Sequence, residues 1–366
     1  MSKIERNKGY FYEKDGVKIS LSDSPHTIQQ VKRKKKQKKI IGWTVGAAIF
    51  AVFAVNILIL PFTTSLPRVE NMSSYSGNNP YICFDEGVML SAHRAGGDLA
   101  PEETLQAFEL CMTSKNYVVD IVEFDLHITK DNQLVLLHDD TLDRTSNSAQ
   151  HFGEKDVKVI DKTYDELRQL NMGENFKKLD GTFPYRGLRG DKISDDIKIL
   201  GLNEILTYLA SMRGEDLHYI IEIKDGGSDG ERAMDILNST LLKFGIADRT
   251  IVGTFKDNVT KYIDNTYPNL HRSASILEVL DFFYAFLYNV DLNKKGLKFD
   301  VLQIPYDQFV LNFGTKAVID YAHKYGLAVQ YWTINDPVKI AELCANGADC
   351  IMTDNPEAGY NIINKK

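Results

Sequence analysis

Residues 119–139 read VDIVEFDLHITKDNQLVLLHD, and this stretch decides the fold. It contains two short apolar runs, 119–129 and 134–138, each of which reads as a β-strand. The polar link between them is too short for the crossover helix that parallel neighbours need. We therefore expect a tight, hairpin-like connection that places His138 across from Asp125. Carboxylates and histidines at strand ends are costly to bury without partners, so this stretch also marks a site.

Strand-like and helix-like segments alternate on either side of this stretch over nearly three hundred residues. Further strands are expected at 88–92, 219–223, 250–255, 271–276, 301–304, 328–332 and 350–352. Helices are expected at 103–114, 202–212, 231–244, 316–325 and 338–346. The alternation predicts an α/β fold with a parallel sheet. Polar groups at the ends of many separate strands favour a closed (β/α)8 TIM-type barrel over an open sheet. A polar stretch at about 146–200 is expected to be a small inserted subdomain.

The N-terminal part has a different character. Seven lysines and arginines crowd into residues 32–39, and Ile40–Phe62 carries no ionised side chain. That apolar run is long enough to span a bilayer core. A cleaved signal peptide is the alternative, but such peptides have their shorter apolar region close to the N-terminus. Positive charge stays on the cytoplasmic side. We therefore expect a single-pass protein of the cell membrane with a cytoplasmic basic tail (1–39), a transmembrane helix (40–62), a linker (63–86) and an extracytoplasmic barrel (87–366).

Net charge and cysteine spacing exclude some other classes of protein. The formal net charge of the 366 residues is −7, whereas nucleic-acid binders are usually basic, so no nucleic-acid partner is expected. The four cysteines form no CxxC pair and suit neither a zinc site nor a redox motif. We expect them to be free thiols.

Three acidic residues have the arrangement of a cation site. Glu123 and Asp125 lie two apart on an expected strand, so their side chains share one face. Glu222, near the end of another strand, would complete a three-carboxylate oxygen site, which suits Ca²⁺ or Mg²⁺. The alternative is that these carboxylates only form surface salt bridges with Arg94 and Lys224.

An ordered set of motifs resembles the glycerophosphodiester phosphodiesterase family. The motifs are Ala92-His93-Arg94, Pro101-Glu102, Glu123-x-Asp125, Thr129-Lys130-Asp131, His138-Asp139 and Glu222-x-Lys224, with Trp332-Thr333-Ile334-Asn335 and Thr353-Asp354-Asn355-Pro356 near the C-terminus. The resemblance covers roughly residues 88–358. It implies a barrel with an insertion after the His138 strand and one divalent cation. It also implies an enzyme, a phosphoric diester hydrolase that cleaves glycerophosphodiesters to glycerol 3-phosphate and an alcohol.

The resemblance also implies roles for individual residues. His93 and His138 match the family's catalytic acid–base pair. The implied metal ligands are Glu123, Asp125 and Glu222. The implied substrate- and phosphate-binding residues are Arg94, Lys224, Glu102 and Trp332. Glu103 departs from the family, which usually has Asn after Pro-Glu. His127 lies next but one to Asp125, yet we expect it to be structural.

The resemblance is compatible with three kinds of native substrate. These are a free glycerophosphodiester, a lysolipid and a polyglycerol-phosphate polymer of the envelope. The alternative activity is that of a phospholipase D-like barrel acting on lysolipid or sphingolipid. Residues 277–288 hold a dense aromatic cluster, which reads either as a helix packed on the barrel or as an apolar patch that touches the bilayer or an acyl chain.

Overall fold

The computed structural model describes residues 79–83, 87–213, 216–292, 296–308 and 311–365, together with the backbone of 11–14 and 17–20. β1 (Phe11–Lys14) and β2 (Val17–Ser20) pair antiparallel in a separate unit. The remaining elements form a second unit, Arg68–Lys366. Within the described residues, no helix has the length and apolarity needed to cross a membrane. The expected span Ile40–Phe62 lies outside the described residues.

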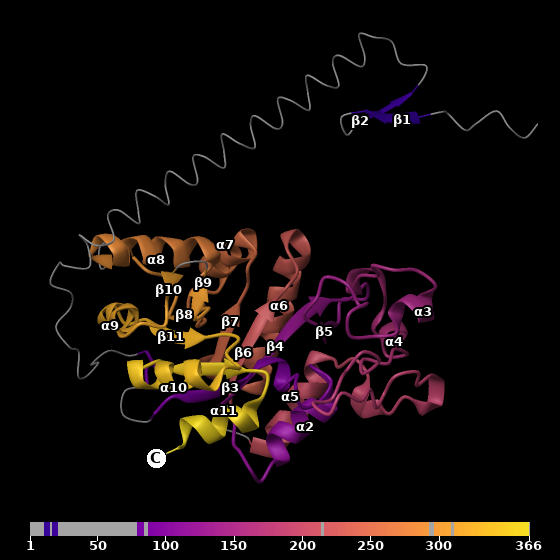
Figure 1. The fold of residues 1–366 in the computed structure, drawn as a ribbon, viewed down its shortest axis with the longest axis horizontal. Coiled ribbons are helices and arrows are strands. Elements are labelled where there is room, and N and C mark those ends of the chain that lie inside the picture. Colours follow the sequence, from indigo (N-terminus) through magenta and orange to yellow (C-terminus); the bar gives the residue numbers. More distant parts are fainter. Residues whose placement is uncertain are drawn as a thin grey trace, which may run out of the picture. The chain divides into compact units, whose positions relative to one another are not determined.

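Seven parallel strands form the centre of the second unit (Figure 1). They are β3 (Met89–Ala92), β4 (Ile121–Ile128), β6 (His218–Ile223), β7 (Thr250–Gly253), β8 (Val301–Ile304), β11 (Ala328–Tyr331) and β12 (Cys350–Thr353). They pair in the order β7-β6-β4-β3-β12-β11-β8. The two outer strands are linked through single bridges, Val252 with Arg272 and Ser273 with Val301. The expectation of a TIM-type α/β barrel is thus confirmed as a nearly closed ring.

The segment 271–276, expected to be a strand, takes part in the ring only through these two bridges. A helix starts too soon after it for a full strand to form. The Ser275 side chain accepts the backbone N–H of Glu278, and the Glu278 side chain accepts the N–H of Ser275, which is a capping box. The chain therefore turns into a helix at Ile276.

Helices cover the outside of the barrel (Figure 1). They are α2 (Leu105–Thr113), α5 (Leu202–Arg213), α6 (Gly227–Phe244), α7 (Asp257–Thr266), α8 (Ile276–Tyr288), α9 (Lys316–Lys324), α10 (Pro337–Asn346) and α11 (Pro356–Ile363). The pattern along β4 shows how strands and helices fit together. Val122, Phe124 and Leu126 belong to the apolar layer shared with the helices, where Phe124 contacts Phe108 of α2 edge to face at 5.8 Å. The alternate residues of β4 are therefore turned toward the barrel interior.

β5 (Leu134–Leu136) lies off the ring and pairs antiparallel with β4. The backbone N–H of Leu137 donates to the carbonyl of Asp125 at 3.1 Å, which confirms the hairpin-like link and brings His138 to the site. The polar stretch that follows forms α3 (Ser148–Phe152) and α4 (Tyr164–Leu167), with 3-10 turns at Val159–Asp161, Gly190–Lys192 and Asp195–Ile197. It packs on β5 through a small cluster of its own, made of Val135, Leu137, Leu142, Val157, Val159, Leu167, Leu170, Met172 and Ile199.

Three short elements complete the described part of this unit. The 3-10 turns His93–Ala95 and Ala247–Arg249 follow β3 and precede β7. β9 (Asp307–Gln308) and β10 (Leu311–Asn312) pair antiparallel after β8.

Candidate active site

One pocket gathers polar side chains from several strands of the barrel. His93 directly follows β3, Glu123 and Asp125 belong to β4, and Glu222 belongs to β6. Asp125 is paired with Glu222 in the register of the two strands. The pocket is lined by His93, Arg94, Glu123, Asp125, His138, Ile220, Glu222, Phe255, Gln303, Trp332, Thr333 and Met352. The two histidines and three carboxylates identified in the sequence are therefore brought together.

His93 is oriented by an aspartate from the far end of the chain. Its Nδ1 lies 2.6 Å from Oδ1 of Asp354, which follows β12. The other carboxylate oxygen of Asp354 accepts the side-chain amide of Asn335 at 2.7 Å. Burial lowers the pKa of His93, but the hydrogen bond to Asp354 and the charge of Glu123 outweigh it, so the pKa of His93 is raised. With Nδ1 held in this way, Nε2 is the nitrogen left for proton transfer.

His138 has its own carboxylate. Its Nδ1 lies 2.7 Å from Oδ1 of Asp139, and Arg144 donates to Asp139 as well. Arg144 also donates to both carboxylate oxygens of Glu102, at 2.8 and 2.6 Å. Burial lowers the pKa of His138, with the nearby charges of Lys224 and Arg94 adding to it, and the net shift is downward. The two histidines thus have similar geometry and opposite pKa shifts.

The carboxylates of the pocket repel one another. Burial raises the pKa of Glu123 to about 8, with the charge of Asp125 as the next cause. Burial likewise raises the pKa of Glu222 to about 7, again with Asp125 as the next cause. Asp125 is 1% exposed, and neither of its carboxylate oxygens has a hydrogen-bond partner. Additional positive charge would stabilise this arrangement.

Two positively charged side chains, those of Lys224 and Arg94, contribute part of that charge. Lys224 Nζ lies 3.0 Å from Glu222 Oε1 and 3.4 Å from Asp125 Oδ1. Arg94 Nε lies 3.8 Å from Asp125 Oδ2, and Arg94 Nη1 lies 3.3 Å from Glu102 Oε1. The backbone N–H of Arg94 donates to Glu123 at 2.7 Å. These contacts hold the Lys224 and Arg94 side chains against the acidic cluster.

The donor set fits a hard divalent cation by its chemistry. It offers carboxylate oxygens, two of them without hydrogen bonds, and two carboxyl groups whose pKa values are raised by burial and then by the charge of Asp125. In the described part of the chain, however, no group of three or more His, Cys, Asp or Glu side chains is already placed to hold an ion. The carboxylates would have to turn toward the cation when it binds.

A further carboxylate, Glu103, is buried behind this cluster. Its Oε1 accepts the backbone N–H of Asp125 at 2.6 Å, and its Oε2 has no partner. Burial raises the pKa of Glu103 well above its ordinary value, and the charge of Asp125 raises it further. This residue therefore fixes the backbone beside Asp125, at the position where the chain departs from the resembled family.

Some residues identified in the sequence lie beside the pocket instead of in its wall. Glu102 holds Arg94 and Arg144, and Lys224 holds Glu222 and Asp125. His127 bonds Asp225 at 2.8 Å and is 4% exposed, as expected of a structural histidine.

Trp332 and Phe255 form the apolar side of the pocket, with ring centroids 6.0 Å apart. Sequence reasoning missed Phe255, and it assigned Asp354 no part in orienting His93. Asp139, which orients His138, is its neighbour in the sequence, whereas Asp354 lies in a separate motif near the C-terminus.

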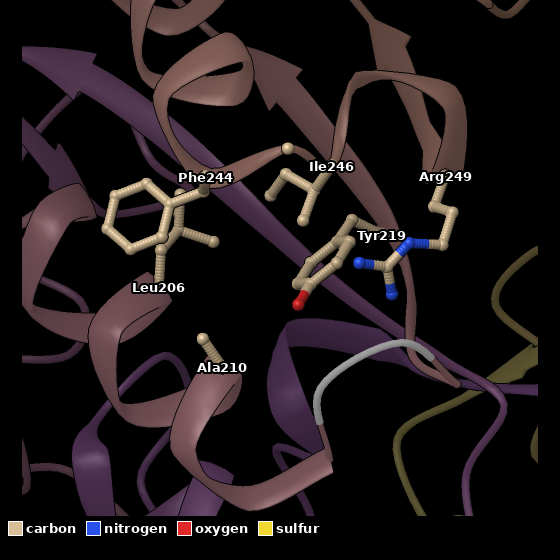
Figure 2. Close-up of a pocket in the computed structure, with 7 residues that line it drawn as sticks. Leu206, Ala210, Tyr219, Phe244, Ile246 and Arg249 are labelled. Carbon is tan, nitrogen blue, oxygen red and sulfur yellow. The ribbon is translucent and has the colours of Figure 1, made fainter.

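A larger cavity of about 510 Å³ lies elsewhere, between α5, the end of α6 and the start of β6 (Figure 2). It is lined by Leu206, Ala210, Tyr219, Phe244, Gly245, Ile246 and Arg249. The Arg249 guanidinium donates to the carbonyl of Leu217 at 2.9 Å. This lining contains no histidine or carboxylate, so the cavity lacks the acid–base groups found in the first pocket.

The sequence of this chain is similar to proteins of one enzyme family. Residues 93–358 match the Glycerophosphoryl diester phosphodiesterase family. A glycerophosphodiester phosphodiesterase of Caldanaerobacter subterraneus is 24% identical over 281 residues, which is 76% of this chain and 98% of the relative.

Two solved structures share the fold. A phosphodiesterase of Oleispira antarctica, in complex with the product sn-glycerol-3-phosphate, has a TM-score of 0.58 at 20% identity and covers 76% of this chain and 98% of its own. A glycerophosphodiester phosphodiesterase of Agrobacterium tumefaciens has a TM-score of 0.54 at 20% identity, with 75% and 99% covered. Both crystallised chains therefore match almost completely while leaving about a quarter of this chain uncovered.

Proposed function

The chain belongs to the glycerophosphoryl diester phosphodiesterase family, and we propose from its site which residues carry the reaction. It is a phosphoric diester hydrolase that cleaves glycerophosphodiesters to glycerol 3-phosphate. The proposal is that His93 and His138 are its acid–base pair. The observation that carries it is their arrangement, because both line one pocket and each has Nδ1 held by its own carboxylate.

The opposite pKa shifts suggest how the pair divides the work. His138, with its lowered pKa, is neutral near pH 7 and takes a proton from the attacking oxygen. His93, whose pKa is raised, is the more readily protonated of the two and gives a proton to the leaving alkoxide as the phosphorus–oxygen bond breaks. Asp354 and Asp139 keep the two imidazoles in the required orientation.

Family members generally use a divalent cation, and here Glu123, Asp125 and Glu222 would hold it. Their oxygen donors suit Ca²⁺ or Mg²⁺. When bound, the cation supplies positive charge that offsets the charge of the phosphate. The crowding of the three carboxylates, with raised pKa values at two of them, supports this assignment.

The remaining residues are proposed to bind the substrate. Arg94 lines the pocket and suits bidentate contact with phosphate oxygens. Lys224 adds positive charge next to Glu222. Glu102 keeps Arg94 in place, and Trp332 with Phe255 offers an apolar wall to the glycerol moiety.

We also propose that the enzyme is anchored in the cell membrane through Ile40–Phe62 and faces the extracytoplasmic side. The support is in the sequence, where a basic block precedes an apolar run without ionised side chains. Such a location makes membrane lysolipids and envelope glycerol-phosphate polymers candidate substrates besides free glycerophosphodiesters.

A substrate panel tests the proposal. The protein is incubated with glycerophosphocholine, a lysophospholipid and a polyglycerol-phosphate, with added Ca²⁺, Mg²⁺ or chelator. We expect glycerol 3-phosphate from at least one of them, and loss of the product with chelator. Release of a lipid phosphate from the lysophospholipid, without glycerol 3-phosphate, would support a phospholipase D-like reaction instead.

A further inference from the structure

The outer face of α8 is the largest group of exposed apolar side chains on one described element. Its large exposed residues are Ile276 (52%), Leu277 (60%), Leu280 (49%), Tyr284 (44%) and Tyr288 (43%). Four of them recur at every fourth position, so they form a continuous stripe along the helix. The aromatic cluster seen in the sequence is therefore divided between two faces of one helix.

The other face of α8 is core. Phe282 and Phe286 are buried and contact the ring of Tyr321 on α9 at 5.5 and 5.6 Å. Phe283 contacts Phe313 at 4.7 Å. These rings account for the packing of α8 on the barrel. The residues of the stripe stay 43–60% exposed, so the stripe is distinct from this buried face.

We infer that the exposed stripe of α8 contacts the surface of a lipid bilayer. The residue types favour lipid, since leucine and isoleucine insert into the acyl boundary and tyrosine is enriched at membrane interfaces. Asp281 is the one ionised side chain exposed between Ile276 and Tyr288, so this face carries no basic cluster for an acidic protein partner. Contiguous apolar surface of this kind marks an interaction site.

The first described residues of the second unit are held close to β8 and β11. The side chain of Asn79 donates to the carbonyls of Asp300 and Gly326 at 2.7 and 2.8 Å, just before β8 and β11. α9 connects these two strands, and α8 packs on α9. The chain therefore enters at the amino-terminal ends of β8 and β11, next to the helix on which α8 packs.

Residues 63–78 separate that entry point from the apolar run Ile40–Phe62. Sixteen extended residues span at most about 55 Å. The reach of residues 63–78 matters only if Ile40–Phe62 is the membrane anchor proposed above, whereas the exposure of the stripe does not depend on that anchor. The stripe also begins at the end of the barrel that carries the site, because Ile276 follows the extended segment Arg272–Ser273.

The test uses the fragment 68–366, which lacks the apolar run. This fragment holds every buried residue of the described core, and the crystallised relatives consist almost entirely of the matching part. Flotation with phosphatidylcholine vesicles is compared for the fragment and for Leu277→Ser/Leu280→Ser. The matched control is Leu179→Ser/Leu242→Ser, whose leucines are 73% and 64% exposed outside α8. Melting temperature and hydrolysis of glycerophosphocholine verify folding.

We expect the fragment to float with the vesicles. The α8 variant should lose about tenfold or more of its bound fraction, because Leu277 and Leu280, 60% and 49% exposed, supply apolar surface to the contact. The control should bind like the parent. A fragment that stays at the bottom of the gradient, or an equal loss in both variants, overturns the inference. So does a fragment that light scattering shows to be a dimer and that the α8 substitutions convert to a monomer.

A second measurement does not depend on the serine variants folding. Leu280→Trp is introduced into the fragment, where Trp332 is then the other tryptophan. Vesicles of brominated phosphatidylcholine should quench the added fluorescence, both in the fragment and in the full chain carrying Trp43→Phe and reconstituted in the same lipid. The absence of quenching in the fragment contradicts the inference. Quenching that is lost in the full chain also contradicts it, because it would mean that the run Ile40–Phe62 covers α8.

Discussion

Asp354→Asn should shift the pH dependence of the reaction in one direction only. The aspartate holds Nδ1 of His93 at 2.6 Å, and its hydrogen bond is the main cause that raises the pKa of His93 against burial. A hydrogen bond to a charged group contributes about 1.5–3 kcal/mol. The Asp354 side chain is 26% exposed, which favours the lower end of that range. Loss of this hydrogen bond should therefore lower the pKa of His93.

The sign follows from the proposed role of His93 as the acid. kcat/KM falls as the pH rises through the pKa of an essential acid, so the basic limb of the profile reports His93 in the free enzyme. Lowering that pKa moves the basic limb to lower pH. The assay is kcat/KM for glycerophosphocholine from pH 5 to 10. Asp229→Asn is the matched control, because Asp229 is exposed and pairs with Arg232 on the surface.

The two limbs distinguish the possible errors. A basic limb that stays in place would mean that Asp354 does not tune the acid. If the acidic limb moves to lower pH instead, His93 is the base and the roles of the two histidines are reversed. If Asp229→Asn shifts the profile as much as Asp354→Asn, the change reflects overall charge and the reasoning fails.

Three further predictions follow from the site and the core. Glu123→Gln should abolish most activity and weaken the rise in melting temperature caused by Ca²⁺ or Mg²⁺. Glu109→Gln, on the exposed side of α2, should change neither property. An unaltered melting response to the metal in Glu123→Gln would exclude Glu123 as a ligand. His93→Ala and His138→Ala should each lower kcat by orders of magnitude in single-turnover assays. The double variant should be little worse than the worse single variant, because groups that act as a unit are not additive. Strictly multiplicative losses would argue against a coupled pair. Phe108→Ala should lower the free energy of unfolding by about 3–5 kcal/mol in denaturant titrations, because Phe108 is fully buried against β4; a loss below about 1 kcal/mol would show that the site relaxes around the gap.

Much of the barrel was predictable because its strands and helices carry local signals. The period of two along β4 placed Glu123 and Asp125 on one face, and the short link after β4 brought His138 to them. Where local signals were weak, prediction failed. α7 was missed because Asp257–Thr266 is mostly polar, with few apolar positions to reveal a helical period.

The orienting partner of His93 depends on ring closure, which no local pattern reports. Asp354 is 261 residues away from His93 in sequence, and they meet because β12 pairs with β3. The motif around Asp354 was visible, but nothing in it pointed to His93. In contrast, Asp139 is adjacent to His138 and could have been paired with it from the sequence. The basic tail and the apolar run remain predictions, since they lie outside the described residues.

The central claim is a cation-dependent cleavage of glycerophosphodiesters by His93 and His138. It is tested most directly by following glycerophosphocholine with ³¹P NMR, using protein first stripped of divalent ions and then supplied with Ca²⁺ or Mg²⁺. We predict that the diester persists in the stripped sample, that glycerol 3-phosphate appears when the ion is restored, and that His93→Ala and His138→Ala leave the diester intact under both conditions. Release of phosphocholine in place of glycerol 3-phosphate, full turnover without the ion, or full turnover by either histidine variant would contradict the account.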